Sequence, residues 1–372
     1  MNIKLGSIAT VALIALSMST QQSVAQPLAG YPSNYGQLIE GARKEAKLVV
    51  YSVLSNKAAA PLVNDFRALY PDVKVEYDGE SGSTEIYDRF KDEVGSGKPS
   101  ADVLWSSAMD LQMKLVEDGY ALTYRSPEAG KLPSWATYKN LAYGTTFEPV
   151  VFVYNKQFVS ADEVPRDRAS LVKLLASKPE KYRGKVTTFD IEKSGVGFMF
   201  AVQDQKLHPE MDTLLRAFGA ADFRASPGTG TMLTKVASGE YLLGYNMMGA
   251  YAMVRAKKDL PGLGVVIPTD YTQVLSRVMF ISKHARSPNA AKLWTDYVLS
   301  ARGQKVIGDS LELFAIRNDV DAEYTAAKLS VQIGRNAKPI PLSAEITLPL
   351  EAIAHRAFLT NYKAAVAAGV AR

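Results

Sequence analysis

The sequence predicts an α/β protein made of two lobes. Segments with the pattern of buried strands alternate with segments whose apolar residues recur at helical spacing, which is typical of a parallel sheet covered by helices. The chain has 372 residues, more than a single domain usually has, so two lobes are expected. Residues 149–155 form a continuous apolar run, which we interpret as a long strand that passes from one lobe to the other.

The first lobe is expected to begin with three strand–helix units. Its segments in order are a strand at 47–51, a helix at 60–69, a strand at 73–77, a helix after Thr84, a strand at 101–105 and a helix that runs to 118–119. Pro71 follows the first of these helices and stops it. In the second helix Ile86, Phe90 and Val94 recur every four residues and predict its buried face.

The middle of the chain repeats this pattern, and the chain is then expected to return to the first lobe. A second series of strands and helices is predicted from Lys185 to about Phe280, and residues 278–282 are the candidate strand that leads back. Ser287 and Pro288 are residue types favoured at an N-cap and at the first helical position, so together they predict a helix start.

These elements divide the chain between the lobes. We expect a first lobe of residues 26–148 and 283–372, and a second lobe of residues 149–282. The last helix, at about 348–367, is rich in alanine and is expected to pack on the first lobe.

The first 25 residues have the pattern of a secretory signal peptide. Lys4 is the only charged residue before Glu40, an apolar stretch covers 8–18, and residues 23–25 have the small-x-small form of a cleavage site. That apolar stretch is too short to cross a bilayer. The chain also contains no cysteine, which excludes disulfides and thiolate metal sites. Export without disulfides fits a bacterial periplasm.

The charge of the chain argues against nucleic acid as a partner. The formal net charge is +5, and the basic residues are interleaved with acidic ones rather than gathered in a stripe. We expect a monomer without a cofactor.

Three short clusters of Ser, Thr and Gly each lie where a predicted strand gives way to a helix. They occupy 81–84, 194–197 and 226–231. Helix starts have unpaired backbone N–H groups and the positive end of the helix dipole, so they favour anions. Glycine allows close approach to a ligand, and hydroxyls add neutral donors. One such cluster would be ordinary capping, but three predict a cleft that binds a small anionic solute. The candidate residues are Ser83, Thr84, Ser194, Gly195, Val196 and Thr229.

Further candidates follow two other predicted strands. Trp105, Ser106 and Ser107 lie at the carboxyl end of one strand, and Tyr245 and Asn246 lie at the end of another. Ligands of α/β proteins bind at that edge of the sheet, although Trp105 has an equally good alternative role as a core residue.

Two arginines are candidate charge partners for the anion. Arg277 and Arg317 have the guanidinium that carboxylates and phosphates prefer. The alternative is an ordinary solvated surface arginine.

The chain resembles the extracellular solute-binding proteins of ABC transporters, in the ferric-binding-like type II periplasmic group. The residues that carry the resemblance are 101–104, 154–155, 194–197, 287–294, 300–304 and 314–320. The resemblance implies a two-lobed type II periplasmic binding protein fold with two hinge crossovers and a ligand cleft between the lobes. It also implies lobe closure on the ligand and docking on an ABC transporter membrane permease.

The sequence departs from the iron-binding members of this group. Those members hold ferric ion with a His, a Glu and two adjacent tyrosines. Here residues 52–57 contain no His, residues 105–107 contain no Glu, and residues 244–251 contain no Tyr-Tyr pair. Ferric ion needs hard oxygen ligands, so iron is not expected. The Ser194-Gly195 turn, which matches the part that binds the companion anion, remains. An organophosphate, phosphonate or carboxylate is therefore the leading ligand class.

Three alternatives stay open. A metal-binding transport protein would need another ligand set, such as Tyr245 and Tyr251. A receptor could present its solute to a sensor instead of a permease. A periplasmic hydrolase would need catalytic residues, but the phosphate-loop-like segment 95–98 is followed by Pro99 where Ser or Thr is required. We therefore expect a binding protein and not an enzyme.

Overall fold

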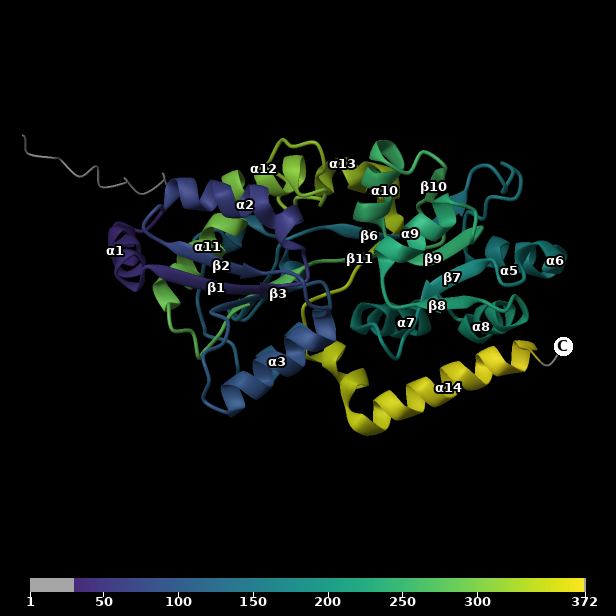
Figure 1. Ribbon diagram of the computed structural model, residues 1–372, viewed down its shortest axis with the longest axis horizontal. Coiled ribbons are helices and arrows are strands. Elements are labelled where there is room, and N and C mark those ends of the chain that lie inside the picture. Colours follow the sequence, from purple (N-terminus) through teal and green to yellow (C-terminus); the bar gives the residue numbers. More distant parts are fainter. Residues whose placement is uncertain (1–29, 371–372) are drawn as a thin grey trace, which may run out of the picture.

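The computed structural model describes residues 30–370, so the predicted signal peptide at 1–25 lies outside it. Two lobes lie side by side along the long axis of the molecule, each built around one β-sheet with helices on both faces (Figure 1). This architecture confirms the predicted two-lobed α/β fold.

The sheet of the first lobe has the strand order β2-β1-β3-β12-β5-β4. Its strands are β1 (Lys47–Ser52), β2 (Lys74–Asp78), β3 (Val103–Ser106), β4 (Thr137–Tyr138), β5 (Ala142–Gly144) and β12 (Val278–Ile281). β1 is parallel to β2 and β3, whereas β12 is antiparallel to its neighbours β3 and β5. The helices of this lobe are α1 (Tyr35–Glu45), α2 (Asn56–Leu69), α3 (Ser83–Gly95), α4 (Met109–Glu117), α11 (Pro288–Leu299), α12 (Ala301–Ser310) and α13 (Ala326–Ile333).

The sheet of the second lobe has the strand order β13-β11-β6-β9-β7-β8, with β10 paired to β6. Its strands are β6 (Glu148–Asn155), β7 (Val186–Phe189), β8 (Arg224–Ser226), β9 (Leu243–Met248), β10 (Leu263–Val266), β11 (Thr272–Leu275) and β13 (Ala337–Pro339). The helices are α5 (Arg168–Ser177), α6 (Pro179–Tyr182), α7 (Gly195–Leu207), α8 (Met211–Ala220), α9 (Thr229–Ala237), α10 (Gly249–Lys258) and α14 (Ala352–Val370).

Four short 3-10 helices complete the described chain. They are η1 (Ala129–Lys131), η2 (Ser134–Ala136), η3 (Gly334–Asn336) and η4 (Ala344–Leu350). Of these, η4 packs on α4 of the first lobe.

Two of the connections between the lobes lie side by side at the hinge, and the chain crosses again between α13 of the first lobe and β13 of the second. The first joins β5 to β6, and the second joins β11 to β12. The N–H and the hydroxyl of Thr145 both donate to the carbonyl of Arg277 at 2.9 Å, and the Arg277 N–H donates to Thr146 Oγ1 at 2.9 Å. The crossovers are therefore held together by hydrogen bonds where the chain passes between the lobes.

The second crossover ends earlier along the chain than the sequence indicates. The division expected at Ser282 assigns residues 278–281 to the second lobe, whereas β12 pairs with β3 and β5 of the first sheet. The strand pattern of these residues was recognised, but the pattern carries no information about the sheet in which a strand pairs.

The prediction that the C-terminal helix packs on the first lobe is wrong, because α14 packs along α8 of the second lobe (Figure 1). Two glycines explain this close approach. A Cβ atom at Gly219 of α8 would lie 1.9 Å from the carbonyl oxygen of Val366, and one at Gly369 of α14 would lie 1.9 Å from that of Arg216. Only glycine at both positions allows the two backbones to touch.

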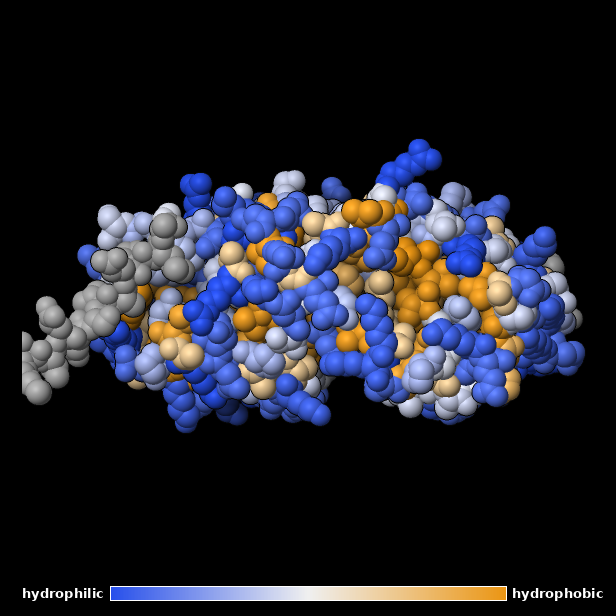
Figure 2. Space-filling model, turned by 90° about the horizontal axis from the view of Figure 1, so that it is seen from above, coloured by the Kyte–Doolittle hydropathy of each residue, from blue (hydrophilic) through white to orange (hydrophobic). Residues whose placement is uncertain are grey.

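The surface differs between the lobes. Seen from above, the first lobe is covered mainly by hydrophilic residues, while a broad apolar area is exposed over the second lobe (Figure 2).

No helix within residues 30–370 is both long and apolar enough to cross a membrane.

Candidate functional site: the cleft between the lobes

A cleft of about 460 Å³ is lined by residues of both lobes. Four helices begin at it: α3 of the first lobe, and α7, α9 and α10 of the second; the starts of α3, α7 and α9 carry the three predicted clusters. The first turn of each helix carries N–H groups without a partner in the helix and the positive end of the helix dipole. The three clusters predicted from the sequence therefore meet in one cavity that favours an anion. The predicted residues that line it are Ser83, Thr84, Ser107, Ser194, Val196 and Thr229.

The starts of α3 and α9 have no side-chain cap. Their N-cap residues are Gly82 and Gly228, which have no side-chain oxygen to offer. At α7, by contrast, Ser194 Oγ accepts a hydrogen bond from the Gly197 N–H at 3.3 Å. Of the three helix starts that carry the predicted clusters, two thus keep their first N–H groups available for a ligand.

The start of α2, which does not line the cleft, is satisfied by the protein itself. Ser55 Oγ accepts from the Ala58 N–H at 3.3 Å, and the Glu80 carboxylate accepts from the Asn56 N–H at 3.0 Å. Side chains therefore accept from two of the first N–H groups of α2, whereas α3 and α9 have no side-chain acceptor at their N-caps.

Two hydroxyl groups beside the cleft are buried without a hydrogen-bond partner. Thr229 is 6% exposed and lines the cleft, and Ser226 is 7% exposed at the end of β8. Thr229 Oγ1 and Ser226 Oγ have no partner within the described part of the chain. Buried polar atoms nearly always have a partner, so this loop indicates a place for a ligand or for water.

Gly195 lies where the two lobes meet. A Cβ atom at this position would lie 3.0 Å from Leu111 Cδ1 and 3.2 Å from Ser83 Oγ, both in the first lobe. Gly195 therefore allows the start of α7 to approach the first lobe, although it is not itself among the cleft-lining residues.

Two charged side chains line the cleft, one from each lobe. Glu85 follows Thr84 in the first turn of α3, and Lys193 directly precedes Ser194. The Lys193 ammonium lies 3.7 Å from the Asp190 carboxylate and remains largely exposed. The two charges balance, so positive potential at the cleft comes mainly from the helix dipoles and their unpaired N–H groups.

Trp105 and Ser106 do not line the cleft. Trp105 is fully buried in the core of the first lobe, and its indole N–H donates to Thr145 Oγ1 at 2.8 Å. Ser106 Oγ accepts from the Ala108 N–H at 3.2 Å within the loop before α4. The structure therefore gives Trp105 the core role that sequence analysis weighed as its alternative.

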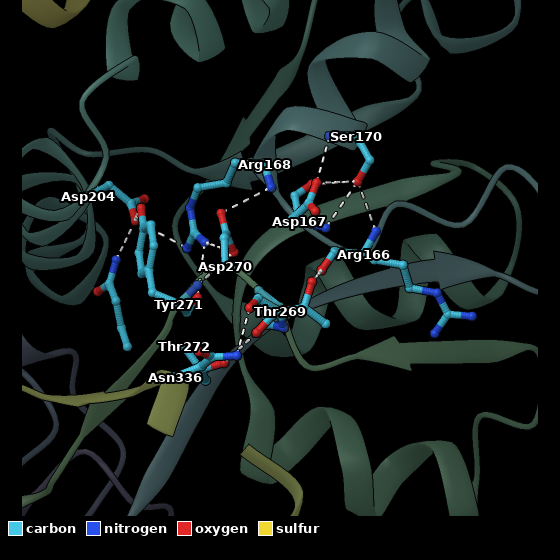
Figure 3. A network of polar contacts seen from close by, with 12 residues as sticks. Arg166, Asp167, Arg168, Ser170, Asp204, Thr269, Asp270, Tyr271, Thr272 and Asn336 are labelled. Atoms are coloured by element: carbon cyan, nitrogen blue, oxygen red, sulfur yellow. Dashed lines mark hydrogen bonds and ion pairs between the residues drawn. The ribbon is translucent and has the colours of Figure 1, made fainter. Parts of the chain in front are cut away.

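Tyr245 and Asn246 belong to a buried polar network inside the second lobe. The Tyr245 hydroxyl donates to Asp204 at 2.8 Å and accepts from Arg168 Nε at 2.8 Å. The Asn246 side-chain amide donates to the same carboxylate at 2.6 Å. Figure 3 shows Arg168, Asp204 and Tyr271 together in this network. Neither of the two predicted residues lines the cleft.

Arg277 lies at the hinge and contacts the cleft-lining residue Tyr251. Its guanidinium pairs with the Glu148 carboxylate at 2.9 Å and donates to the Tyr251 hydroxyl at 2.7 Å. Arg277 is 1% exposed and is not among the residues that line the cleft. Arg317 does not line the cleft either, because it is buried in ion pairs with Glu128 and Asp319.

Sequence analysis missed several residues that line the cleft. Glu85 and Lys193 directly adjoin predicted residues, so their position along the chain was an available signal. Phe189 and Met248 end strands β7 and β9, at the sheet edge that the sequence indicated. Tyr251, in the first turn of α10, was considered only as a metal ligand.

The described residues offer few side chains that could together ligate a metal ion. Within residues 30–370, no group of three or more His, Cys, Asp or Glu side chains is placed to hold one. Tyr245 packs in the core of the second lobe, whereas Tyr251 packs where the two larger core clusters meet. The two tyrosines proposed as an alternative ligand pair therefore belong to separate networks.

Comparisons with known proteins agree with this architecture. Residues 52–305, more than half of the chain, match the model of a family described as bacterial extracellular solute-binding protein. A substrate binding protein of an ABC transporter from Agrobacterium tumefaciens is 34% identical, with a TM-score of 0.81, and the match covers 88% of this chain and 96% of that chain.

More distant structures share the fold. The periplasmic binding protein AfuA from Actinobacillus pleuropneumoniae, solved with fructose-6-phosphate bound, is 19% identical over 86% of this chain and 98% of that chain, with a TM-score of 0.68. A ferric binding protein from Campylobacter jejuni is 18% identical over 86% of this chain and 99% of that chain, also with a TM-score of 0.68.

A comparison with curated protein sequences finds no significant match. The family model and the Agrobacterium structure carry the assignment, and they confirm the resemblance drawn from the sequence. The chain belongs to the bacterial extracellular solute-binding proteins, the substrate-binding components of ABC transporters.

Proposed function

We propose that this protein binds a small anionic organic solute in the interlobe cleft and delivers it to the membrane permease of an ABC importer. The solute class is an organophosphate, a phosphonate or a carboxylate. The observation that carries the proposal is the meeting of three helix starts in one cleft, two of them uncapped, beside the buried and unpartnered hydroxyl of Thr229.

The donors around the cleft suit a phosphate or carboxylate group. Backbone N–H groups at helix starts and the hydroxyls of Ser83, Ser107 and Thr229 form directional hydrogen bonds to anionic oxygens. Only Lys193 adds a full positive charge to the lining, and it is largely exposed. Such a site can bind an anion specifically and still release it, as a transport protein must.

The lining also offers a place for the organic part of the solute. Phe189, Val196 and Met248 supply apolar surface, and Tyr251 adds an aromatic ring. Small-molecule sites commonly combine apolar walls with a few well-placed polar groups. The phosphate ester named in the AfuA structure is a ligand of this kind, which supports including phosphate esters among the candidates.

We place the working protein in the periplasm. The support is the signal-peptide pattern at residues 1–25 together with the extracellular family assignment. Closure of the lobes on the solute would create the form that the permease recognises.

A thermal-shift panel tests the solute class. The purified exported protein is heated with phosphate esters, phosphonates, carboxylates, polyamines and ferric ion in separate samples. A ligand that binds only the folded state at 100 times its Kd stabilises it by about 2.7 kcal/mol. We expect a large rise in Tm with one anionic class. A rise with ferric ion alone, or turnover of model phosphate esters, would contradict the proposal.

A pair of threonine variants on α9 tests the site. Thr229→Val removes the unpartnered hydroxyl at the cleft, so we expect a rise in Kd of about 10-fold for the anion found in the panel. Thr234→Val is the matched control, since that exposed hydroxyl donates to the Gly230 carbonyl at 3.1 Å in the same helix. Equal affinities of both variants and the wild type would move the anion site elsewhere.

A further inference from the structure

Tyr251 lines the cleft and has an unused hydrogen-bond donor. Its hydroxyl oxygen accepts an N–H of Arg277 at 2.7 Å. The hydroxyl proton donates to no acceptor within residues 30–370. A hydroxyl group can donate and accept at once, so the donating half of this group is still available.

Arg277 is fixed in place by the hinge. Its Nε donates to Glu148 Oε1 at 2.9 Å and its Nη2 donates to Glu148 Oε2 at 3.4 Å. Glu148 also accepts from the Thr146 hydroxyl at 2.8 Å. Arg277 is 1% exposed and Glu148 is 0% exposed. The guanidinium therefore has a single orientation, in which one N–H points at the Tyr251 oxygen.

This arrangement makes the Tyr251 hydroxyl a better donor. A cationic group that donates to the phenol oxygen draws electron density from it, and hydrogen bonds in such a chain strengthen one another. Burial raises the pKa of Tyr251 above its usual value, although Arg277 opposes the shift. The hydroxyl thus keeps its proton at neutral pH.

We propose that the Tyr251 hydroxyl donates a hydrogen bond to the anionic group of the bound solute, and that Arg277 orients and polarises this hydroxyl without touching the solute. Tyr251 is then a binding residue and Arg277 a positioning residue. The inference rests on the proposed function, because it requires an anion in the cleft. It also assigns a role to the buried Arg277, which acts on a ligand in the cleft only through its hydrogen bond to Tyr251.

Titration calorimetry on single variants makes the first test. Fructose 6-phosphate, ethylphosphonate and succinate serve as probes of the three anionic classes. Tyr251→Phe should raise the Kd of the bound probe by about 10-fold, the effect of one hydrogen bond to a charged group, with little change in Tm without ligand. Tyr77→Phe is the matched control near the hinge, because its hydroxyl donates to the Leu54 carbonyl at 3.1 Å and it does not line the cleft.

A double-mutant cycle tests the positioning role. Lysine cannot donate to Glu148 and Tyr251 in the same fork geometry, so Arg277→Lys should weaken probe binding. In the Tyr251→Phe background the same change should have no further effect on Kd, because Arg277 acts through the phenol. Glu148→Gln replaces Arg277→Lys in the cycle if the lysine variant does not fold.

The outcomes separate the inference from the proposed function. If no probe binds the wild type, the anionic-solute proposal and the inference both fall. If a probe binds the wild type and Tyr251→Phe equally well, only the inference falls. Additive losses in the double variant would overturn the positioning role of Arg277.

Discussion

Two buried arginines of this protein have the same kinds of partner, a buried carboxylate and a tyrosine hydroxyl. Arg168 in the second lobe and Arg277 at the hinge are each 1% exposed at the side chain, and each pairs with a carboxylate that is 0% exposed. Each also donates to a tyrosine hydroxyl, Tyr245 at 2.8 Å and Tyr251 at 2.7 Å.

The two networks differ in where the tyrosine proton goes. Tyr245 donates to Asp204, the same carboxylate that accepts from Tyr271 at 2.7 Å and from Gln273 at 2.6 Å. The Tyr245 proton therefore has an acceptor inside the lobe, and in this sense the network is closed; Figure 3 shows Arg168, Asp204 and Tyr271 of it. At Tyr251 no such acceptor is found among the described residues, and Tyr251 lines the cleft. A closed network holds a lobe together, whereas an open one at a cavity has a donor left for a ligand.

The largest effect is expected from breaking the closed network. Arg168→Met leaves the Asp204 carboxylate buried without its cation, so the free energy of unfolding should fall by about 3–5 kcal/mol. Urea denaturation measures this. The control is Arg166→Ala, because Arg166 is exposed and contributes only its backbone to the network. This variant should change the free energy of unfolding by about 0.5 kcal/mol or less. A loss below about 1 kcal/mol for Arg168→Met would mean that the network is not structural.

A buried carboxylate with no arginine should make stability depend on pH. Asp110 is 2% exposed and its Oδ2 has no partner within the described chain, and burial raises its pKa to about 7. The unfolded chain releases this proton near the ordinary value of 3.8, so the folded state holds the extra proton between pH 4 and 7. Stability should therefore fall as pH rises through this window, by at most about 4 kcal/mol.

Asp110→Asn should remove most of that slope and be more stable than the wild type at pH 8. Burial also raises the pKa of Asp296 to about 6, so a smaller slope should remain at lower pH. Asp88→Asn on the exposed side of α3 is the control and should leave the profile unchanged. Thermal melts between pH 4 and 8 decide the matter, and a flat wild-type profile would refute the prediction.

Gly195→Val tests whether binding in the cleft beside the open network requires the close approach of the two lobes at Gly195. The new side chain would press on Leu111 and Ser83 across the cleft, so we expect Kd to rise by about 10- to 100-fold. Stability without ligand should change little. Gly197→Ala two residues later makes the opposite case, because its Cβ would lie 2.4 Å from Phe189 Cβ of the same lobe and should lower stability. Wild-type affinity in Gly195→Val would place lobe contact elsewhere.

A variant of Tyr245 sharpens the comparison itself. Tyr245→Phe removes one donor from Asp204 and one acceptor from Arg168, so stability should fall by about 1–3 kcal/mol. Binding of the anionic probe should be unchanged, because Tyr245 does not line the cleft. This is the reverse of the result expected for Tyr251→Phe. If both tyrosine variants lose affinity equally, the distinction between the two networks is wrong.

Local patterns in the sequence predicted most elements of both sheets. Strand β6 was visible as the apolar run at 149–155, and the face of α3 was visible in the spacing of Ile86, Phe90 and Val94. The start of α11 at Pro288 was also predicted. The groups that satisfy its first turn were not, because the N–H groups of Asn289 and Ala290 donate to the Glu45 carboxylate from α1. Such a partner, more than 240 residues away, leaves no local signal.

The cleft was predicted in part. The three Ser, Thr and Gly clusters follow from short-range chemistry, since each marks a helix start with available N–H groups. Trp105, Tyr245 and Arg277 have residue types that are equally good in a core, a buried network or a site. Which of these roles each one takes depends on neighbours from other strands, such as Thr145, Asp204 and Glu148.

The sequence by itself determined the alternation of strands and helices, the absence of disulfides and the three helix starts that favour an anion, because all of these depend on neighbouring residues or on composition. Only the tertiary structure decided that the three starts share one cleft, that α14 packs on the second lobe through Gly219 and Gly369, and that Tyr251 rather than Tyr245 faces the cavity. These outcomes depend on contacts between segments far apart in the chain, where burial and hydrogen bonding are settled only when the lobes pack.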